Sequence, residues 1–147
     1  MRFVRDELPA DLKEDLKQYV YDIIGAMHEV YRQLDNGLPE YVYQEALLKQ
    51  LVKKGYKDTI KEYQHHPEFN GEKLESYVKM DLMVPKSRGN VIIECKSISE
   101  LTDKERYQTN GYLTATRFPI AILVNFGTFP KAQIERYYAK EGKIYAF

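Results

Sequence analysis

The sequence predicts an α/β fold in which helices flank a mixed sheet, and three observations lead to this class. Apolar residues recur at steps of three and four in the first third of the chain, which is typical of amphipathic helices. Apolar and polar residues alternate in the middle of the chain, as in strands with one buried face. The later run PIAILVNF is apolar almost throughout, as in a central strand that is covered on both faces.

The first third of the chain is expected to form two helices. Apolar side chains at helical spacing run from Leu16 to Leu34, and the sequence Asp-Asn-Gly that follows ends the pattern. Pro39 suits the first position of a second helix, which is expected to end near Lys54, where Gly55 provides a C-terminal cap.

Three strands are expected next. The first covers residues 59–69 and ends at Asn70-Gly71, a strong signal for a β-hairpin. The second covers residues 77–84, and a six-residue turn joins it to the third, VIIECKS, at residues 91–97. Alternation gives each of the last two strands an apolar face, made of Val78, Met80, Leu82 and Val84 in one and of Val91, Ile93 and Cys95 in the other.

The last third is expected to contain a helix between two strands. Thr102 and Glu105 have the spacing of a capping box, and the helix that they open is expected to reach Thr116. Strands follow at residues 119–126 and 134–138. The order α-α-β-β-β-α-β-β gives one domain over residues 1–147, with a core at about residues 16–138.

Composition sets limits on the partners of this domain. The chain has 22 basic and 22 acidic residues, so an interaction with nucleic acid would need a local patch rather than a net positive charge. Cys95 is the only cysteine, which is compatible with a reducing compartment, and no apolar run is long enough for a transmembrane helix. We therefore expect a cytoplasmic protein without a membrane partner.

Two carboxylates and an amine are expected to share one face of the second and third strands. Asp81 lies on the second strand, and Glu94 and Lys96 point the same way on the third, about 6.6 Å apart along the strand. An exposed ion pair explains this pattern in the simplest way. The alternative is a site for Mg²⁺ or Mn²⁺, since a hard divalent cation compensates two adjacent carboxylates.

These residues resemble a known signature. Asp81 followed by Glu94-x-Lys96 is similar to the Asp…(Asp/Glu)-x-Lys pattern of the PD-(D/E)XK nuclease superfamily, although Met80 replaces the proline of the name. The resemblance implies a restriction-endonuclease-like α-β-β-β-α-β core, here with an extra N-terminal helix and a C-terminal strand. The segment GLPEYVY and the later MDLMV, VIIECKS and ILVNFG resemble the GxxExxY proteins of that superfamily.

The resemblance also implies roles for site residues. Asp81 and Glu94 would bind the metal with the backbone carbonyl of Cys95, and Lys96 would be the catalytic lysine. Glu40 would be a further ligand or would hold a metal-bound water. From the residues alone, the helix dipole is the better explanation of Glu40, and the resemblance makes a role in the site equally plausible.

Three aromatic or amide side chains complete the predicted site. Gln108 and Tyr112, one helical turn apart, resemble a Gln-x-x-x-Tyr pair that positions nucleic acid in one nuclease branch. Tyr43 is expected to pack behind the site, with its hydroxyl on a carboxylate.

Two functions remain open from the sequence. The first is a Mg²⁺- or Mn²⁺-dependent nuclease that hydrolyses phosphodiester bonds of DNA or RNA with a metal-activated water. The second is an inactive module of the same fold that binds nucleic acid or protein. A homodimer that builds a joint groove from exposed tyrosines is a third expectation.

Overall fold

A seven-stranded mixed sheet forms the centre of the computed structural model, which describes residues 2–147. Its strand order is β1-β9-β8-β7-β6-β5-β2. The strands are β1 (Arg2–Phe3), β2 (Ile60–His65), β5 (Val78–Val84), β6 (Val91–Lys96), β7 (Ile120–Asn125), β8 (Gln133–Lys140) and β9 (Lys143–Ala146). This sheet with its flanking helices confirms the predicted α/β class.

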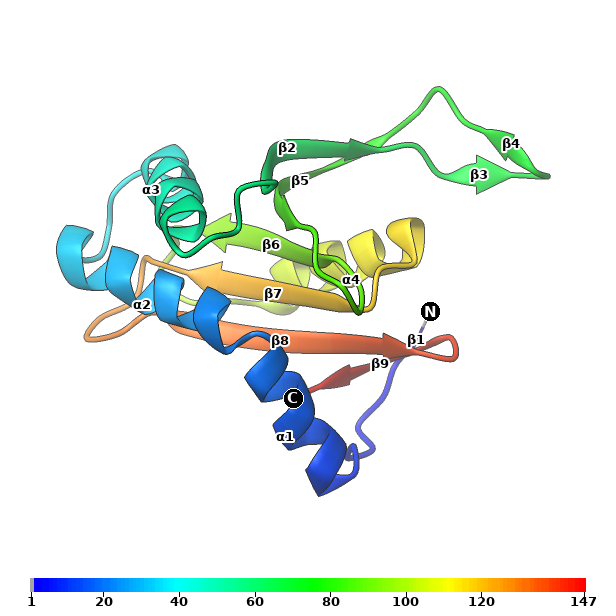
Figure 1. Cartoon of the computed structure of the whole chain (residues 1–147), viewed down its shortest axis with the longest axis horizontal. Helices are drawn as coiled ribbons and strands as arrows, with labels where there is room; N and C mark the ends of the chain where they lie inside the picture. Colours follow the sequence, from blue (N-terminus) through cyan, green and yellow to red (C-terminus); the bar gives the residue numbers. More distant parts are fainter. Residues whose placement is uncertain (1) are drawn as a thin grey trace.

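Helices cover both faces of the sheet (Figure 1). The helices are α1 (Ala10–Tyr19), α2 (Tyr21–Leu34), α3 (Glu40–Lys53) and α4 (Asp103–Thr116). The first three pack on one face, around a core that includes Ile93 and Cys95. α4 packs on the other face, around Ile92 and Leu113. Every residue of β7 is buried, as expected for a strand that is covered on both faces.

The first helical segment differs from its prediction. The helix begins earlier, at Ala10 just after Pro9, and it is interrupted at Val20, which has non-helical dihedral angles. Val20 is completely buried at this junction. The hydroxyl of the neighbouring Tyr19 donates to the carbonyl of Gly89, at 3.0 Å, and so fixes the bend against the turn between β5 and β6. Within residues 2–147, no helix is both long and apolar enough to cross a membrane.

The predicted hairpin at Asn70-Gly71 forms a separate two-stranded arm. Its strands are β3 (Glu68–Phe69) and β4 (Glu72–Lys73), and both turn residues have positive φ angles, as a tight hairpin turn requires. The arm extends away from the sheet beyond the end of β2 (Figure 1). The predicted strand at residues 59–69 is therefore divided into β2 and β3.

The alternate apolar side chains of β5 are divided between the two cores. The prediction that they form one face is therefore wrong. Leu82 and Val84 pack with α2 and α3, whereas Met80 and Val78 pack with α4 on the opposite side. The strand changes sides at Asp81. Pairing with β2 is interrupted at the same point. Leu82 pairs with Lys61 and Met80 pairs with Tyr63, whereas Asp81 between them has no partner in the ladder. The irregular residue is thus a candidate site residue.

Candidate active site

Asp81 and Glu94 lie where the ladder between β5 and β6 ends. The last backbone pair in this direction is Leu82 with Ile93. At the next position the N–H of Asp81 donates to the Glu94 carboxyl, at 3.1 Å, and the N–H of Cys95 donates to the Asp81 carboxylate, at 2.7 Å. Side-chain oxygens thus replace backbone carbonyls as acceptors. This exchange brings the two carboxyl groups together between the strands.

Burial makes this pair electrostatically costly. Glu94 is only 4% exposed. Burial, the nearby charge of Asp81 and a hydrogen bond between the two carboxyl groups raise the pKa of Glu94 to about 8, and Lys96 offsets this only in part. At neutral pH the pair therefore holds a proton. A divalent cation would take the place of this proton, so the donor set fits a hard cation.

The backbone of Cys95 lies beside the two carboxyl groups. The carbonyl of Lys96 accepts from the N–H of Phe126, which follows β7, at 2.8 Å. Successive residues of a strand direct their backbone groups to opposite neighbours, so the carbonyl of Cys95 faces β5 and the acidic pair. The Cys95 thiol is fully buried in the opposite core, as predicted, and burial raises its pKa. Only the carbonyl of Cys95 is thus placed to act as a ligand.

α4 contacts both charged residues of β6. The predicted capping box of Thr102 and Glu105 is present at its start. Gln108 accepts a hydrogen bond from the Lys96 ammonium, at 2.9 Å. One turn later, Tyr112 is 8% exposed, and burial together with the adjacent Glu94 carboxyl raises its pKa above the usual range. The two residues predicted to position nucleic acid thus lie beside Lys96 and Glu94.

The GLPEYVY segment forms the turn that leads into α3. Gly37 has a φ of 92°, which favours glycine, and the exposed Glu40 is the first helical residue. The hydroxyl of Tyr43 donates to the carbonyl of Asp35, at 2.5 Å, and accepts from the N–H of Leu38, at 3.1 Å. The prediction that this hydroxyl caps a carboxylate is therefore wrong: Tyr43 holds the backbone that leads to Glu40.

Glu40 lies near the acidic pair without joining it. Its charge contributes to the raised pKa of Cys95, which places it within electrostatic range. Within residues 2–147, however, no three side chains of His, Cys, Asp or Glu form a group that could hold a metal. The candidate side-chain ligands are therefore the carboxyl groups of Asp81 and Glu94, and Glu40 remains a predicted participant.

Two buried amides that sequence reasoning missed support the site. Gln44 on α3 donates to the backbone carbonyl of Asp81, at 3.0 Å. Asn125 forms hydrogen bonds with both the N–H and the carbonyl of Ile98, each at 3.0 Å, and so fixes the chain just after Lys96. A polar residue inside the apolar stripe of a helix, or at the end of an apolar strand, is the signal that could have found them.

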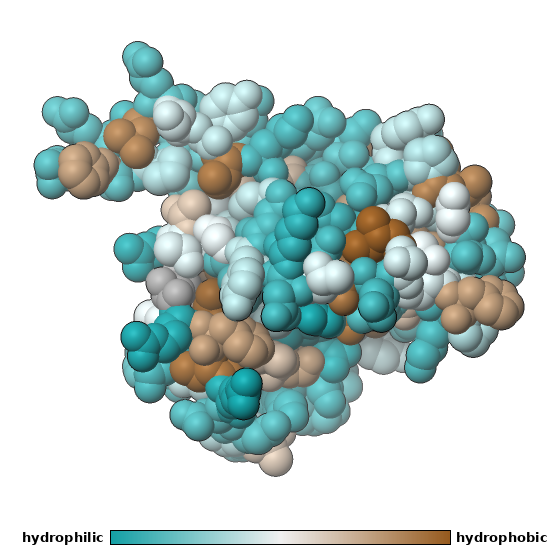
Figure 2. All heavy atoms as spheres, turned by 180° about the vertical axis from the view of Figure 1, so that it is seen from behind, coloured by the Kyte–Doolittle hydropathy of each residue, from teal (hydrophilic) through white to brown (hydrophobic). Residues whose placement is uncertain are grey.

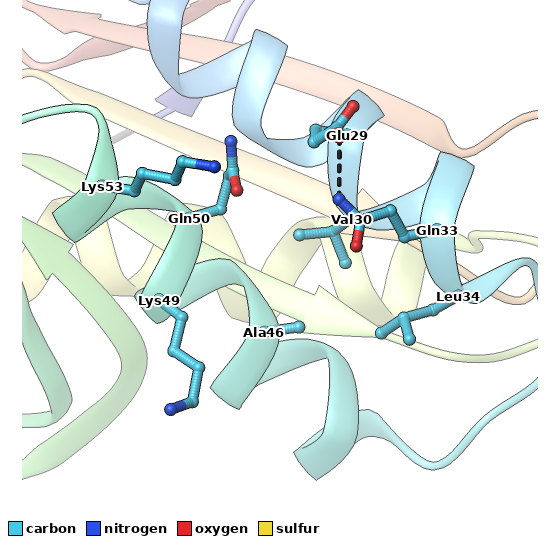
Figure 3. A pocket seen from close by; sticks show the side chains of 8 residues that line it. All are labelled: Glu29, Val30, Gln33, Leu34, Ala46, Lys49, Gln50 and Lys53. Atoms are coloured by element: carbon cyan, nitrogen blue, oxygen red, sulfur yellow. Dashed lines mark hydrogen bonds between the residues drawn. The ribbon is translucent and has the colours of Figure 1, made fainter.

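A hollow between α2 and α3 offers no comparable chemistry (Figure 3). Its volume is about 240 Å³. Glu29 is the one carboxylate among its lining residues, and it is paired with Arg32 at 2.6 Å and bonded to Gln33 at 2.8 Å. The acidic pair between β5 and β6 thus remains the candidate catalytic centre.

Comparison with known proteins places the chain in a family. The family model of the PD-(D/E)XK nuclease superfamily matches residues 17–137. A search of curated proteins finds no significant match. The chain is also similar to a solved structure titled "Crystal structure of SSO0001", with 16% sequence identity, a TM-score of 0.41 and coverage of 85% of this chain and 74% of that chain. Because the family match spans most of its length, the chain belongs to the PD-(D/E)XK nuclease superfamily, whose members are typically nucleases that use divalent metal ions.

Proposed function

We propose that this chain is a nuclease that hydrolyses phosphodiester bonds of DNA or RNA with Mg²⁺ or Mn²⁺ held by Asp81 and Glu94. The observation that carries the proposal is the meeting of two carboxyl groups between β5 and β6. The buried Glu94 carboxyl accepts from the N–H of Asp81, and the Asp81 carboxylate accepts from the N–H of Cys95. Lys96, two residues along β6, supplies the third charged group of the superfamily signature. Strongly shifted pKa values, such as that of Glu94, cluster at functional sites.

Each residue has a distinct chemical part in this proposal. A bound divalent cation would supply Lewis-acid chemistry at the phosphate and lower the pKa of a bound water. Asp81, Glu94 and the Cys95 carbonyl hold the cation, and Glu94 gives up its proton when the cation binds. Lys96 neutralises charge on the scissile phosphate or orients the attacking water. Gln108 keeps the Lys96 ammonium at the end of β6, at 2.9 Å.

We also infer that the chain belongs to the GxxExxY branch of the superfamily. The motif has a physical basis in this fold. Gly37 takes the positive φ of the turn, Glu40 begins α3, and the Tyr43 hydroxyl holds the turn in place. In this proposal Glu40 assists the site from the helix N-terminus, either through a metal-bound water or as a further ligand.

The test is a cleavage assay with labelled single-stranded DNA, duplex DNA and single-stranded RNA, each with Mg²⁺, with Mn²⁺ and with EDTA. Lys96→Met removes the ammonium but keeps an unbranched side chain, and it is expected to lower the cleavage rate by about 10²-fold or more. The matched control is Lys140→Met, which removes an exposed lysine at the end of β8 and should cleave as the wild type does.

Two results would contradict the proposal. The first is equal cleavage by wild type and Lys96→Met, which would indicate a contaminating nuclease. The second is the absence of cleavage on all three substrates with either metal. Binding of nucleic acid without cleavage would favour the inactive module in place of the enzyme.

A further inference from the structure

We propose that the exposed face of α4 and the groove beside its C-terminal end form a track for a single strand of nucleic acid that leads to Lys96. This inference rests on the proposed nuclease function and adds its substrate class and path. The track is defined by α4 residues Lys104, Tyr107, Gln108, Gly111 and Thr114, followed by Arg117.

The groove lies between the β3–β4 arm and the C-terminal end of α4. Its volume is about 820 Å³, and its lining includes His65, His66 and Lys73 on one side and Thr114, Thr116 and Arg117 on the other. Seen from the α4 side, the arm stands out from the body with a notch beneath it (Figure 2). The groove is open to solvent and borders the same helix that holds Lys96.

After its first turn, the exposed face of α4 carries no carboxylate. Its exposed positions after the first turn recur at helical spacing, and they are occupied by Tyr107, Gln108, Gly111 and Thr114. The acidic residues of the helix are engaged at its start, where Asp103 pairs with Arg106 at 3.1 Å and Glu105 closes the capping box. From Tyr107 to Thr114, a phosphate backbone can therefore follow this face without passing a negative charge.

Gly111 is the least expected residue on this face. Glycine inside a helix destabilises it relative to alanine, so it usually serves close packing against another part of the fold. A Cβ atom added at Gly111 would meet no atom within 4 Å. Nothing in the fold thus requires the glycine, and the free space lies directly beside Gln108 and Thr114 on the exposed face. A strand of nucleic acid that approaches the helix backbone would require it.

Charge and aromatic rings favour a single strand as the occupant. Lys73 and Arg117 line the groove, where Glu68 is the one lining carboxylate and lies opposite Lys73 in the backbone register of the arm. The ring of Tyr107 is 70% exposed on α4, and His66 packs on the half-exposed Tyr77 with ring centroids 5.5 Å apart. Cationic grooves with exposed rings bind unpaired bases by stacking.

The track connects to the catalytic centre through Gln108. From Gln108 to Arg117 the helix rises by about 14 Å. Gln108 accepts a hydrogen bond from Lys96 at one end, and Arg117 lines the groove at the other. A strand lying in the groove therefore reaches Lys96 by crossing Gly111.

The test is fluorescence anisotropy of a labelled oligothymidylate of about 12 nucleotides, its RNA counterpart and a matching duplex, with the full chain in EDTA. Gly111→Gln places a good helix former in the track, and it is expected to weaken single-strand binding by about tenfold without lowering the melting temperature. Arg117→Asn removes a charge at a position with a φ of 62°, which asparagine tolerates, and should also weaken binding.

Two controls act on the opposite face of the sheet. Gly25→Gln changes a helix-interior glycine of α2, where only the flexible end of Lys54 is near, and Lys49→Asn removes an exposed charge from α3. Both should bind the oligonucleotide as the wild type does.

The outcomes separate this inference from the proposed nuclease function. The track is overturned if Gly111→Gln and Arg117→Asn bind the single strand as tightly as the wild type does. It is also overturned if the wild type prefers the duplex, even if the wild type cleaves nucleic acid. Single-strand binding that both variants lose would support the track. If the wild type then cleaves nothing, the track stands and the nuclease proposal fails.

Discussion

At the scale of single residues, the Glu94 carboxyl links the stability of the metal-free protein to pH. Its pKa is raised from 4.5 to about 8 by burial and by Asp81. Between these two pH values the folded state keeps a proton that the unfolded state has lost. The metal-free protein should therefore become less stable as pH rises from about 4.5 to about 8 and level off above that.

Glu94→Gln tests this linkage, because glutamine imitates the protonated carboxyl and still accepts from the N–H of Asp81. At pH 8 in EDTA, we expect the variant to be more stable than the wild type, on the order of 2 kcal/mol, with little difference at pH 4.5. Urea unfolding at the two pH values measures this. A constant difference between the proteins across the pH range would contradict it.

The sequence predicted part of the arrangement of the site residues. Alternation along β6 predicted that Glu94 and Lys96 share a face, and the short turn predicted that Asp81 lies on the neighbouring strand. The side-chain-to-backbone hydrogen bonds that join Asp81 and Glu94 were not predicted. The hydrogen bond from Gln44 to Asp81 and the proximity of Tyr112 to Glu94 depend on how α3 and α4 pack on the sheet. Local periodicity carries no information about such long-range contacts.

At the scale of elements, the segment after β6 is fixed to the segment after β7. The side-chain amide of Asn125 accepts from the N–H of Ile98 and donates to its carbonyl, and Gly127 packs directly against the Ile98 backbone. A Cβ atom added at Gly127 would lie 2.1 Å from the carbonyl oxygen of Ile98. This contact holds the end of β6 and therefore the position of Lys96.

Gly127→Ala should destabilise the protein by about 1–3 kcal/mol, because the backbone of one segment must move. Its matched control is Gly111→Ala, where the added methyl group meets no atom, and which should stabilise the protein by about 0.5–1 kcal/mol. Thermal unfolding of the two variants beside the wild type measures both effects. Equal effects of the two substitutions would contradict this account of the segment.

Elements with strong local signals were predicted and those without them were not. The capping box of α4, the hairpin at Asn70-Gly71 and the apolar β7 all form as expected. The change of side in β5 was missed, because the alternation of apolar residues continues through Asp81 while the backbone does not. β1 and β9 were also missed, since strands of two and four residues carry little pattern.

At the scale of the whole molecule, the candidate site lies where the ladder between β5 and β6 ends, between the helices that cover the two faces of the sheet. On one face, Gln44 of α3 donates to the backbone of Asp81, and on the other, Gln108 and Tyr112 of α4 lie beside Lys96 and Glu94. The sheet supplies the acidic pair between them. The balanced charge of 22 basic and 22 acidic residues means that attraction to nucleic acid must come from a local surface, such as the track along α4.

Metal binding tests the central claim that Asp81 and Glu94 share one divalent cation. The measurement is isothermal titration of metal-free protein with Mn²⁺, for the wild type, for Asp81→Asn and for Glu45→Gln, which changes an exposed carboxylate on α3. We predict saturable binding by the wild type and by Glu45→Gln, and its loss in Asp81→Asn. Equal binding by Asp81→Asn, or no binding by the wild type at millimolar Mn²⁺, would contradict the claim.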